Sequence, residues 1–190
     1  MAAQTFTIEL DGFWREQNKG SIPAKSGVYC VYSCVSNTKE KIILLKKLIY
    51  IGESEDVNNR ISDHEKLPEW RKHLKSGEML CYSFGEVEAT NRARCEAAMI
   101  FKHKLQKNTE YVGSFAFDQT TMNLSGATSL LSTSFTVNRT NSLGLPFPLR
   151  SKGIRRFAAL TSWMGHIFFP IGYPPDWRKK LRVSSEADDE

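Results

Sequence analysis

Residues 27–35, GVYCVYSCV, and residues 42–52, IILLKKLIYIG, decide the fold of this chain. Both runs are rich in Val, Ile, Leu and Tyr, and β-branched and aromatic residues favour strands. The polar residues 37–41 lie between the two runs and interrupt the pattern. We therefore expect two neighbouring strands that form a hairpin with a long connection.

Helical signals follow these strands. Residues 54–65, SEDVNNRISDHE, predict a helix with Ser54 as its N-cap, because Ser favours that position and acidic residues in the first turn complement the helix dipole. Residues 90–107 predict the clearest helix, since Ala97, Ile100, Phe101 and Leu105 recur at helical spacing. Thr90 or Asn91 would cap it.

Two further elements complete the predicted domain. Residues 69–74 predict a short helix, and residues 79–84 a third strand. Apart from the short helix at 69–74, the order is two strands, a helix, a strand and a helix, which favours the α/β (α+β) class. We expect a small three-stranded, mainly antiparallel sheet flanked by helices, with a C-terminal extension.

The flanking regions define the expected domain limits. Residues 1–25 form an N-terminal extension, in which Phe6, Ile8 and Leu10 alternate, and residues 26–110 form the central domain. Residues 111–185 form a C-terminal extension packed on or beside this domain; it is rich in Ser, Thr and Asn up to residue 150 and has an amphipathic helix predicted over 154–169. Residues 186–190 form an acidic tail.

Composition narrows the classes of protein. The net charge is +5 and the pI is about 9.0, which suits a polyanionic partner. The four cysteines form no Cys-x-x-Cys pair, which argues against a zinc ribbon. The chain opens without a signal-peptide pattern and holds no run of 18 apolar residues, so we expect a cytoplasmic protein that does not bind membranes.

One set of residues fits phosphodiester chemistry. Hydrolysis needs an oriented water that loses a proton, a metal ion, and a cation that supports the transition-state charge. Tyrosines lie in the first strand and at the end of the second, and an Arg and a His four residues apart share one face of the next helix. A Glu beside the apolar stripe of the last helix and an Asn beyond it complete the set, which is Tyr29, Tyr50, Arg60, His64, Glu96 and Asn108.

The order and spacing of these residues resemble the GIY-YIG nuclease family over about residues 26–110. The two motifs are GVY at 27–29 and YIG at 50–52, and the runs YIGESEDVNNRISDH and RARCEAAMIFKHKLQKN resemble the segments that follow. Val28 stands where the family usually has Ile, and the segment between Tyr29 and Tyr50 is longer than in the shortest members.

The resemblance implies a metal-dependent DNA endonuclease, a hydrolase with one Mg²⁺ or Mn²⁺ ion. Glu96 would be the one protein ligand of the ion, and Tyr29 would orient the attacking water or take its proton. Arg60 would brace the scissile phosphate, while Tyr50 and His64 would position water or phosphate. Asn108 would hold the site from behind, with Asn123 as a weaker candidate for that role.

DNA is the expected partner. Basic residues expected to contact its phosphates are Lys46, Lys47, Arg71, Lys72, Arg92 and Lys102. The basic clusters at 155–156 and 178–182 fit phosphate contacts and a solvated face equally well.

Each site residue, taken alone, also has a structural explanation: strand tyrosines, a surface Arg, a solvated Glu, an exposed His or a C-capping Asn. Two alternatives therefore remain open, a catalytically inactive nucleic-acid-binding module of the same fold and an unrelated α+β protein-interaction domain. The recognition sequence, the oligomeric state and the choice between restriction, repair and mobile-element roles do not follow from the sequence.

Overall fold

The computed structural model describes residues 2–37 and 42–140. The chain divides into two compact units, Met1–Leu149 and Arg150–Glu190, and the description below concerns the first. The helix predicted over 154–169, the basic clusters at 155–156 and 178–182 and the acidic tail at 186–190 lie outside the described residues.

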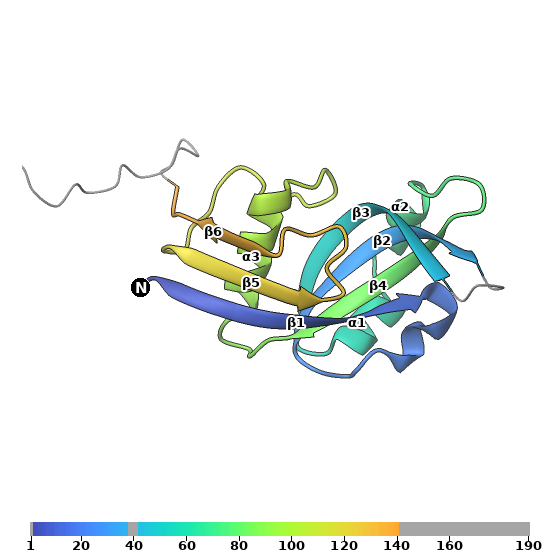
Figure 1. Ribbon diagram of the computed structural model, residues 1–190, viewed down its shortest axis with the longest axis horizontal. Helices are drawn as coiled ribbons and strands as arrows, with labels where there is room; N and C mark the ends of the chain where they lie inside the picture. The colour runs from blue at the N-terminus through green and yellow to red at the C-terminus, as the bar shows by residue number, and fades with distance from the viewer. Residues whose placement is uncertain (1, 38–41, 141–190) are drawn as a thin grey trace, which may run out of the picture. The chain divides into compact units, whose positions relative to one another are not determined.

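A single six-stranded sheet forms the body of this unit, and it curls strongly into a half-barrel (Figure 1). Its strand order is β3-β2-β4-β1-β5-β6, and every pairing is antiparallel except that of β1 with β5. The strands are β1 Gln4–Arg15, β2 Gly27–Asn37, β3 Ile42–Ser54, β4 Met79–Glu86, β5 Thr120–Gly126 and β6 Ser134–Val137.

The α+β class is confirmed, but the prediction of a three-stranded sheet is wrong. The three predicted strands are β2, β3 and β4, and β1, β5 and β6 extend the sheet beyond them. β1 pairs with β4 on one side and with β5 on the other. The alternation of Phe6, Ile8 and Leu10 reflects this strand, whose partners lie about 75 and 115 residues further along the chain.

The helices are few and short. They are the 3₁₀ helix η1 Glu16–Ser21 and the α-helices α1 Val57–Ser62, α2 Leu67–Arg71 and α3 Arg92–His103. Ser54 ends β3, and the N-cap of α1 is Asp56, whose side chain accepts a hydrogen bond of 3.0 Å from the Asn59 amide. Asn91 is the N-cap residue of α3, which ends where Lys104 adopts a left-handed conformation with φ of 48°.

Apolar side chains cover both faces of strand β2, which lies next to the edge strand β3, so its run of buried residues is almost continuous. On one face, Val28 and Cys30 belong to a core that includes α3. On the other face, Tyr29 and Val31 pack with α1 and with Trp70 of α2. Helices therefore pack on both faces of the sheet, and β3 is the edge strand of the sheet on this side.

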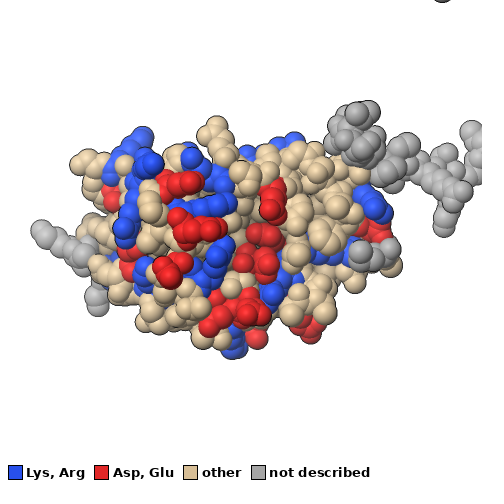
Figure 2. Space-filling model, turned by 180° about the vertical axis from the view of Figure 1, so that it is seen from behind, with Lys and Arg blue, Asp and Glu red and all other residues tan. Residues whose placement is uncertain are grey.

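Charge is unevenly distributed over the surface. Figure 2 shows acidic side chains gathered near the middle of one face, with many of the basic side chains of that face on its left. All four cysteines are free and buried. None of the helices in the described part of the chain has the length and apolar character needed to cross a bilayer.

Candidate active site

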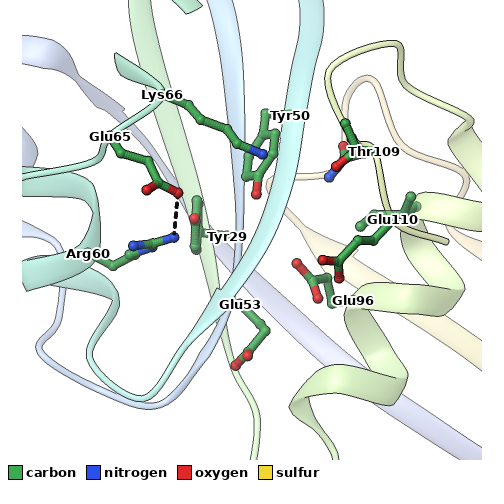
Figure 3. Close-up of a pocket in the computed structure, with 11 residues that line it drawn as sticks. Tyr29, Tyr50, Glu53, Arg60, Glu65, Lys66, Glu96, Thr109 and Glu110 are labelled. Carbon is green, nitrogen blue, oxygen red and sulfur yellow. Dashed lines mark ion pairs between the residues drawn. The ribbon is translucent and has the colours of Figure 1, made fainter. Parts of the chain in front are cut away.

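A pocket of about 250 Å³ opens between α1, β3 and α3 (Figure 3). It brings together five of the six residues that the sequence suggested, and the sixth, His64, lies beside it in contact with Tyr29. The lining residues are Tyr29, Tyr50, Glu53, Arg60, Glu65, Lys66, Glu96, Ile100, Asn108, Thr109 and Glu110.

The two tyrosines meet because β2 and β3 pair closely. Tyr29 lies opposite Gly52 in the register, and its ring centroid is 6.2 Å from that of Tyr50. A Cβ atom at Gly52 would overlap the hydroxyl and ring of Tyr29. Glycine at this position therefore makes room for the phenol at the pocket floor.

His64 supports Tyr29 from within the protein. Its Nε2 atom lies 2.9 Å from the Tyr29 hydroxyl, and its Nδ1 atom accepts a 3.0 Å hydrogen bond from the backbone N–H of Lys66. Burial, with the charges of Arg60 and Lys66, lowers the pKa of His64 to about 4. The ring is then neutral at physiological pH, and because Nδ1 is an acceptor, the proton lies on Nε2 and is donated to Tyr29.

Tyr29 itself is held in the neutral form. Burial and the neighbouring Tyr50 raise the pKa of Tyr29, while hydrogen bonding and the positive charge of Arg60 act in the opposite direction. Burial and the charge of Glu96 raise the pKa of Tyr50 to about 12. Both phenols are therefore protonated near neutral pH in the absence of a further positive charge.

Arg60 comes from α1 and remains available to a ligand. Its side chain is 42% exposed, and its Nη2 atom makes a loose ion pair of 3.6 Å with Glu65. Figure 3 shows the guanidinium beside Tyr29. An incoming phosphate would compete with this exposed carboxylate, in a pair of a kind worth about 0–1 kcal/mol, and with the Tyr29 hydroxyl.

Glu96 projects from α3 and is half-buried. Burial and the nearby carboxylates of Glu53 and Glu110 raise its pKa to about 7. Glu53 is partly neutralised by a 2.7 Å ion pair with Arg92. Four glutamates but only two cationic side chains line the pocket, so negative charge is in excess around Glu96.

This excess fits a divalent cation. Hard ions such as Mg²⁺ prefer carboxylate oxygens and water, and a cation would relieve the repulsion that raises the pKa of Glu96. Among the described residues, no group of three or more His, Cys, Asp or Glu side chains is arranged to hold a metal ion. An ion bound at Glu96 would therefore need water and substrate oxygens for most of its coordination.

Asn108 is buried at the back of the pocket. Its Nδ2 group donates to the Ile51 carbonyl at 2.7 Å, and its Oδ1 atom accepts from the Ile51 amide at 3.3 Å. These bonds fasten the segment after α3 to the strand that carries Tyr50. Asn123 lies on β5 instead, accepts a 2.9 Å hydrogen bond from Ser134 and does not line this pocket of the described structure.

Several lining residues were not predicted from the sequence. Glu53 directly follows the YIG motif, and this adjacency is a signal that could have identified it. Lys66 places its Nζ atom 5.1 Å from the centroid of the Tyr50 ring. Thr109 and Glu110 follow Asn108, whose hydrogen bond to Ile51 holds this segment against β3. No local sequence pattern predicts that long-range contact.

None of the predicted DNA-contacting residues lines this pocket in the described part of the chain. Lys46 and Lys47 are exposed on β3, and Lys102 is exposed on α3 with its Nζ 5.9 Å from the Phe135 ring centroid. Arg71 pairs with Glu16 at 3.1 Å, and Lys72, just after α2, is exposed. Arg92 forms a 2.7 Å ion pair with Glu53, so a DNA phosphate would have to compete with this carboxylate for the guanidinium.

A scan against models of known protein families, and searches among curated proteins and solved structures, found no match to this chain.

Proposed function

We propose that this protein is a metal-dependent endonuclease that hydrolyses DNA phosphodiester bonds at a single-metal site. One observation carries the proposal: a single pocket holds two buried phenols, an exposed guanidinium and a half-buried carboxylate beside further carboxylates. These groups could orient a water, bind a phosphate and hold a metal ion, which are the tasks of phosphodiester hydrolysis. The motif resemblance described above implies the same chemistry.

Glu96 would hold one Mg²⁺ or Mn²⁺ ion. The bound ion neutralises charge on the phosphate and makes a coordinated water more acidic. The pKa of about 7 means that Glu96 is only partly ionised at neutral pH without a cation, so ion binding and proton release are linked. Glu53 and Glu110 add to the field that attracts a cation to this position.

Arg60 would bind the scissile phosphate. Its guanidinium carries a permanent charge and offers paired N–H donors that match phosphate oxygens. Its ion pair with Glu65 is a loose one of 3.6 Å between exposed side chains, so a phosphate could displace that carboxylate at little cost. Extra charge on the phosphate in the transition state would strengthen this contact, which raises the rate.

Tyr29 would orient the attacking water. Because the His64 Nε2–H donates to the phenol oxygen, the hydroxyl hydrogen of Tyr29 is directed away from His64. A remaining lone pair on the same oxygen can accept a hydrogen bond from water. Donors on His64 and Arg60 both stabilise negative charge on this oxygen, so they would favour loss of the phenol's own proton to solvent. The resulting phenolate could then accept the proton of the attacking water.

A plasmid cleavage assay tests the proposal. Supercoiled DNA is incubated with Mg²⁺ and the wild-type protein, with Glu96→Ala, or with Glu88→Ala as a control for loss of an exposed glutamate. We expect nicked or linear DNA with the wild type and the control, but not with Glu96→Ala. If all three were inert yet bound DNA, the inactive binding module would be the correct description.

A further inference from the structure

A second pocket of about 210 Å³ lies next to the candidate active site. Three chain segments form it: the middle of β3, the turn after α2 and the turn after α3. Its lining residues are Lys47, Leu48, Ile49, His73, Lys104, Leu105, Gln106 and Lys107. No acidic side chain of the described residues lines it, whereas four glutamates line the first pocket.

Positive charge converges on this second pocket. Burial and the charges of Lys107 and Lys47 lower the pKa of His73, while Glu69 acts weakly in the opposite direction. The His73 Nε2 atom has no hydrogen-bond partner within the described part of the chain. Lys47 and Lys104 are exposed, and the Lys104 Nζ atom lies 5.3 Å from the centroid of the Phe101 ring.

The walls make the pocket more selective for an anion. Leu48, Ile49 and Leu105 supply apolar surface around the ammonium groups. Low-dielectric walls strengthen the attraction between fixed positive charges and a bound anion. The pocket thus combines three lysines with a surface that excludes part of the solvent.

The two pockets are lined by consecutive residues at two places in the chain, on β3 and after α3. On β3, Leu48 and Ile49 line the second pocket, and the next residue, Tyr50, lines the first. After α3, Gln106 and Lys107 line the second pocket, and the next residue, Asn108, lines the first. A phosphodiester chain bound in the first pocket would therefore meet the second within a short distance.

We propose that the second pocket binds a backbone phosphate of the same DNA strand, flanking the phosphate at the candidate active site. The proposal rests on the nuclease function proposed above. It adds a direction to substrate binding, since the strand would run from Glu96 toward Lys107. The lysines of the second pocket would contribute to DNA affinity but not to the cleavage step, because none of them is among the proposed catalytic residues.

The test measures binding without cleavage. DNA affinity is measured against salt concentration for the full chain carrying Glu96→Gln, with and without Lys47→Gln/Lys107→Gln. Each lost phosphate contact lowers the slope of log affinity against log salt by about 1, so we expect a decrease of about 2. Lys25→Gln/Lys75→Gln is the matched control, since both lysines are exposed and neither lines the first or the second pocket in the described structure. An equal decrease with this control would overturn the proposal.

A scan with neutral methylphosphonate linkages locates the contact. One linkage near the cut site should weaken binding to the protein with intact lysines, and the same linkage should have little effect on the lysine double variant. If wild type cuts DNA but the scan and the salt slope do not respond to the lysines, only the second-pocket proposal fails. If wild type neither binds nor cuts DNA, both proposals fail together.

Discussion

At the scale of single residues, the site depends on how Tyr29 is held. The phenol is buried against Gly52, receives a hydrogen bond from a neutral His64 and lies beside the Arg60 guanidinium. These contacts place one oxygen atom at the pocket floor with donors behind it and open space in front. Under the proposed function, the hydroxyl rather than the ring of Tyr29 would act on the attacking water.

Replacing Tyr29 with Phe should lower the cleavage rate by about 10²–10⁴-fold, the usual range for a lost proton-transfer group. DNA affinity should change little, because the ring still fills its place. Tyr82→Phe is the control, since the Tyr82 hydroxyl donates a 2.6 Å hydrogen bond to Glu16 and does not line the pocket of the described structure. Near-wild-type cleavage by Tyr29→Phe would contradict the assigned role.

Glu96 should reduce the stability of the metal-free protein. Its pKa is raised from 4.5 to about 7 in the folded state, so between these pH values the folded chain binds a proton that the unfolded chain does not. The stability contributed by this group is therefore lost as pH rises from about 4.5 to 7. Glu96→Gln should be more stable than wild type above pH 7 in EDTA, by about 1–3 kcal/mol.

Urea unfolding at several pH values measures this difference. The advantage of Glu96→Gln should disappear below about pH 4.5, where the wild-type carboxyl is protonated in both states. Adding Mg²⁺ or Mn²⁺ should stabilise the wild type and leave the variant unchanged. Equal stabilisation of both proteins by the ion would place the ion elsewhere.

At the scale of elements, β3 and α3 form the site together because Asn108 joins them. The amide satisfies both the N–H and the carbonyl of Ile51, and Ile51 lies between Tyr50 and Gly52. This contact also brings Glu110 within reach of Glu96. The geometry of the pocket therefore depends on one buried side chain outside any regular element.

Asn108→Ala should lower the free energy of unfolding by about 2–3 kcal/mol, because it leaves buried backbone groups of Ile51 without partners. Denaturant unfolding gives the value. Asn123→Ala, which removes a bond to the exposed Ser134 on β6, should change stability by less than about 1 kcal/mol. A similar decrease in the free energy of unfolding in both variants would contradict a particular contribution of the hydrogen bonds to Ile51.

Much at this scale follows from local sequence. The strands β2, β3 and β4 and the helix α3 have clear apolar patterns, and residues 27–29 and 50–52 predict where the two phenols meet. Helix ends depend on finer contacts: Asp56 caps α1, although Ser54 has an equally suitable side chain. The partners of Asn108 were not predictable, because a side-chain bond across 57 residues leaves no local pattern.

At the scale of the whole molecule, distant segments complete the sheet. β1 enters between β4 and β5, so strands that are far apart in sequence become neighbours. Arg94 secures this arrangement from α3, since it is buried and donates to Thr120 at 2.8 Å and to the carbonyls of Asp118 and Gln119. The three-stranded prediction was wrong because β1 pairs with β4 and β5 across long stretches of chain, and the local alternation of Phe6, Ile8 and Leu10 does not show which strands it joins.

Arg94→Met should lower the free energy of unfolding by about 2–4 kcal/mol, because the apolar side chain keeps the volume but loses several charge-assisted hydrogen bonds. Thermal or urea unfolding tests this. Arg139→Met is the matched control: its exposed side chain makes a 3.5 Å ion pair with Asp118, which is worth about 0–1 kcal/mol. A stable Arg94→Met protein would mean that apolar packing alone holds β5 in place.

Single-turnover cleavage of an end-labelled DNA duplex, at saturating protein, tests the central claim most directly. The account predicts cutting by wild type in Mg²⁺, none in EDTA, and a rate at least about 10²-fold lower for Glu96→Gln with DNA affinity largely retained. Cutting in EDTA, or cutting by Glu96→Gln at the wild-type rate, would contradict a metal-dependent site built on this carboxylate.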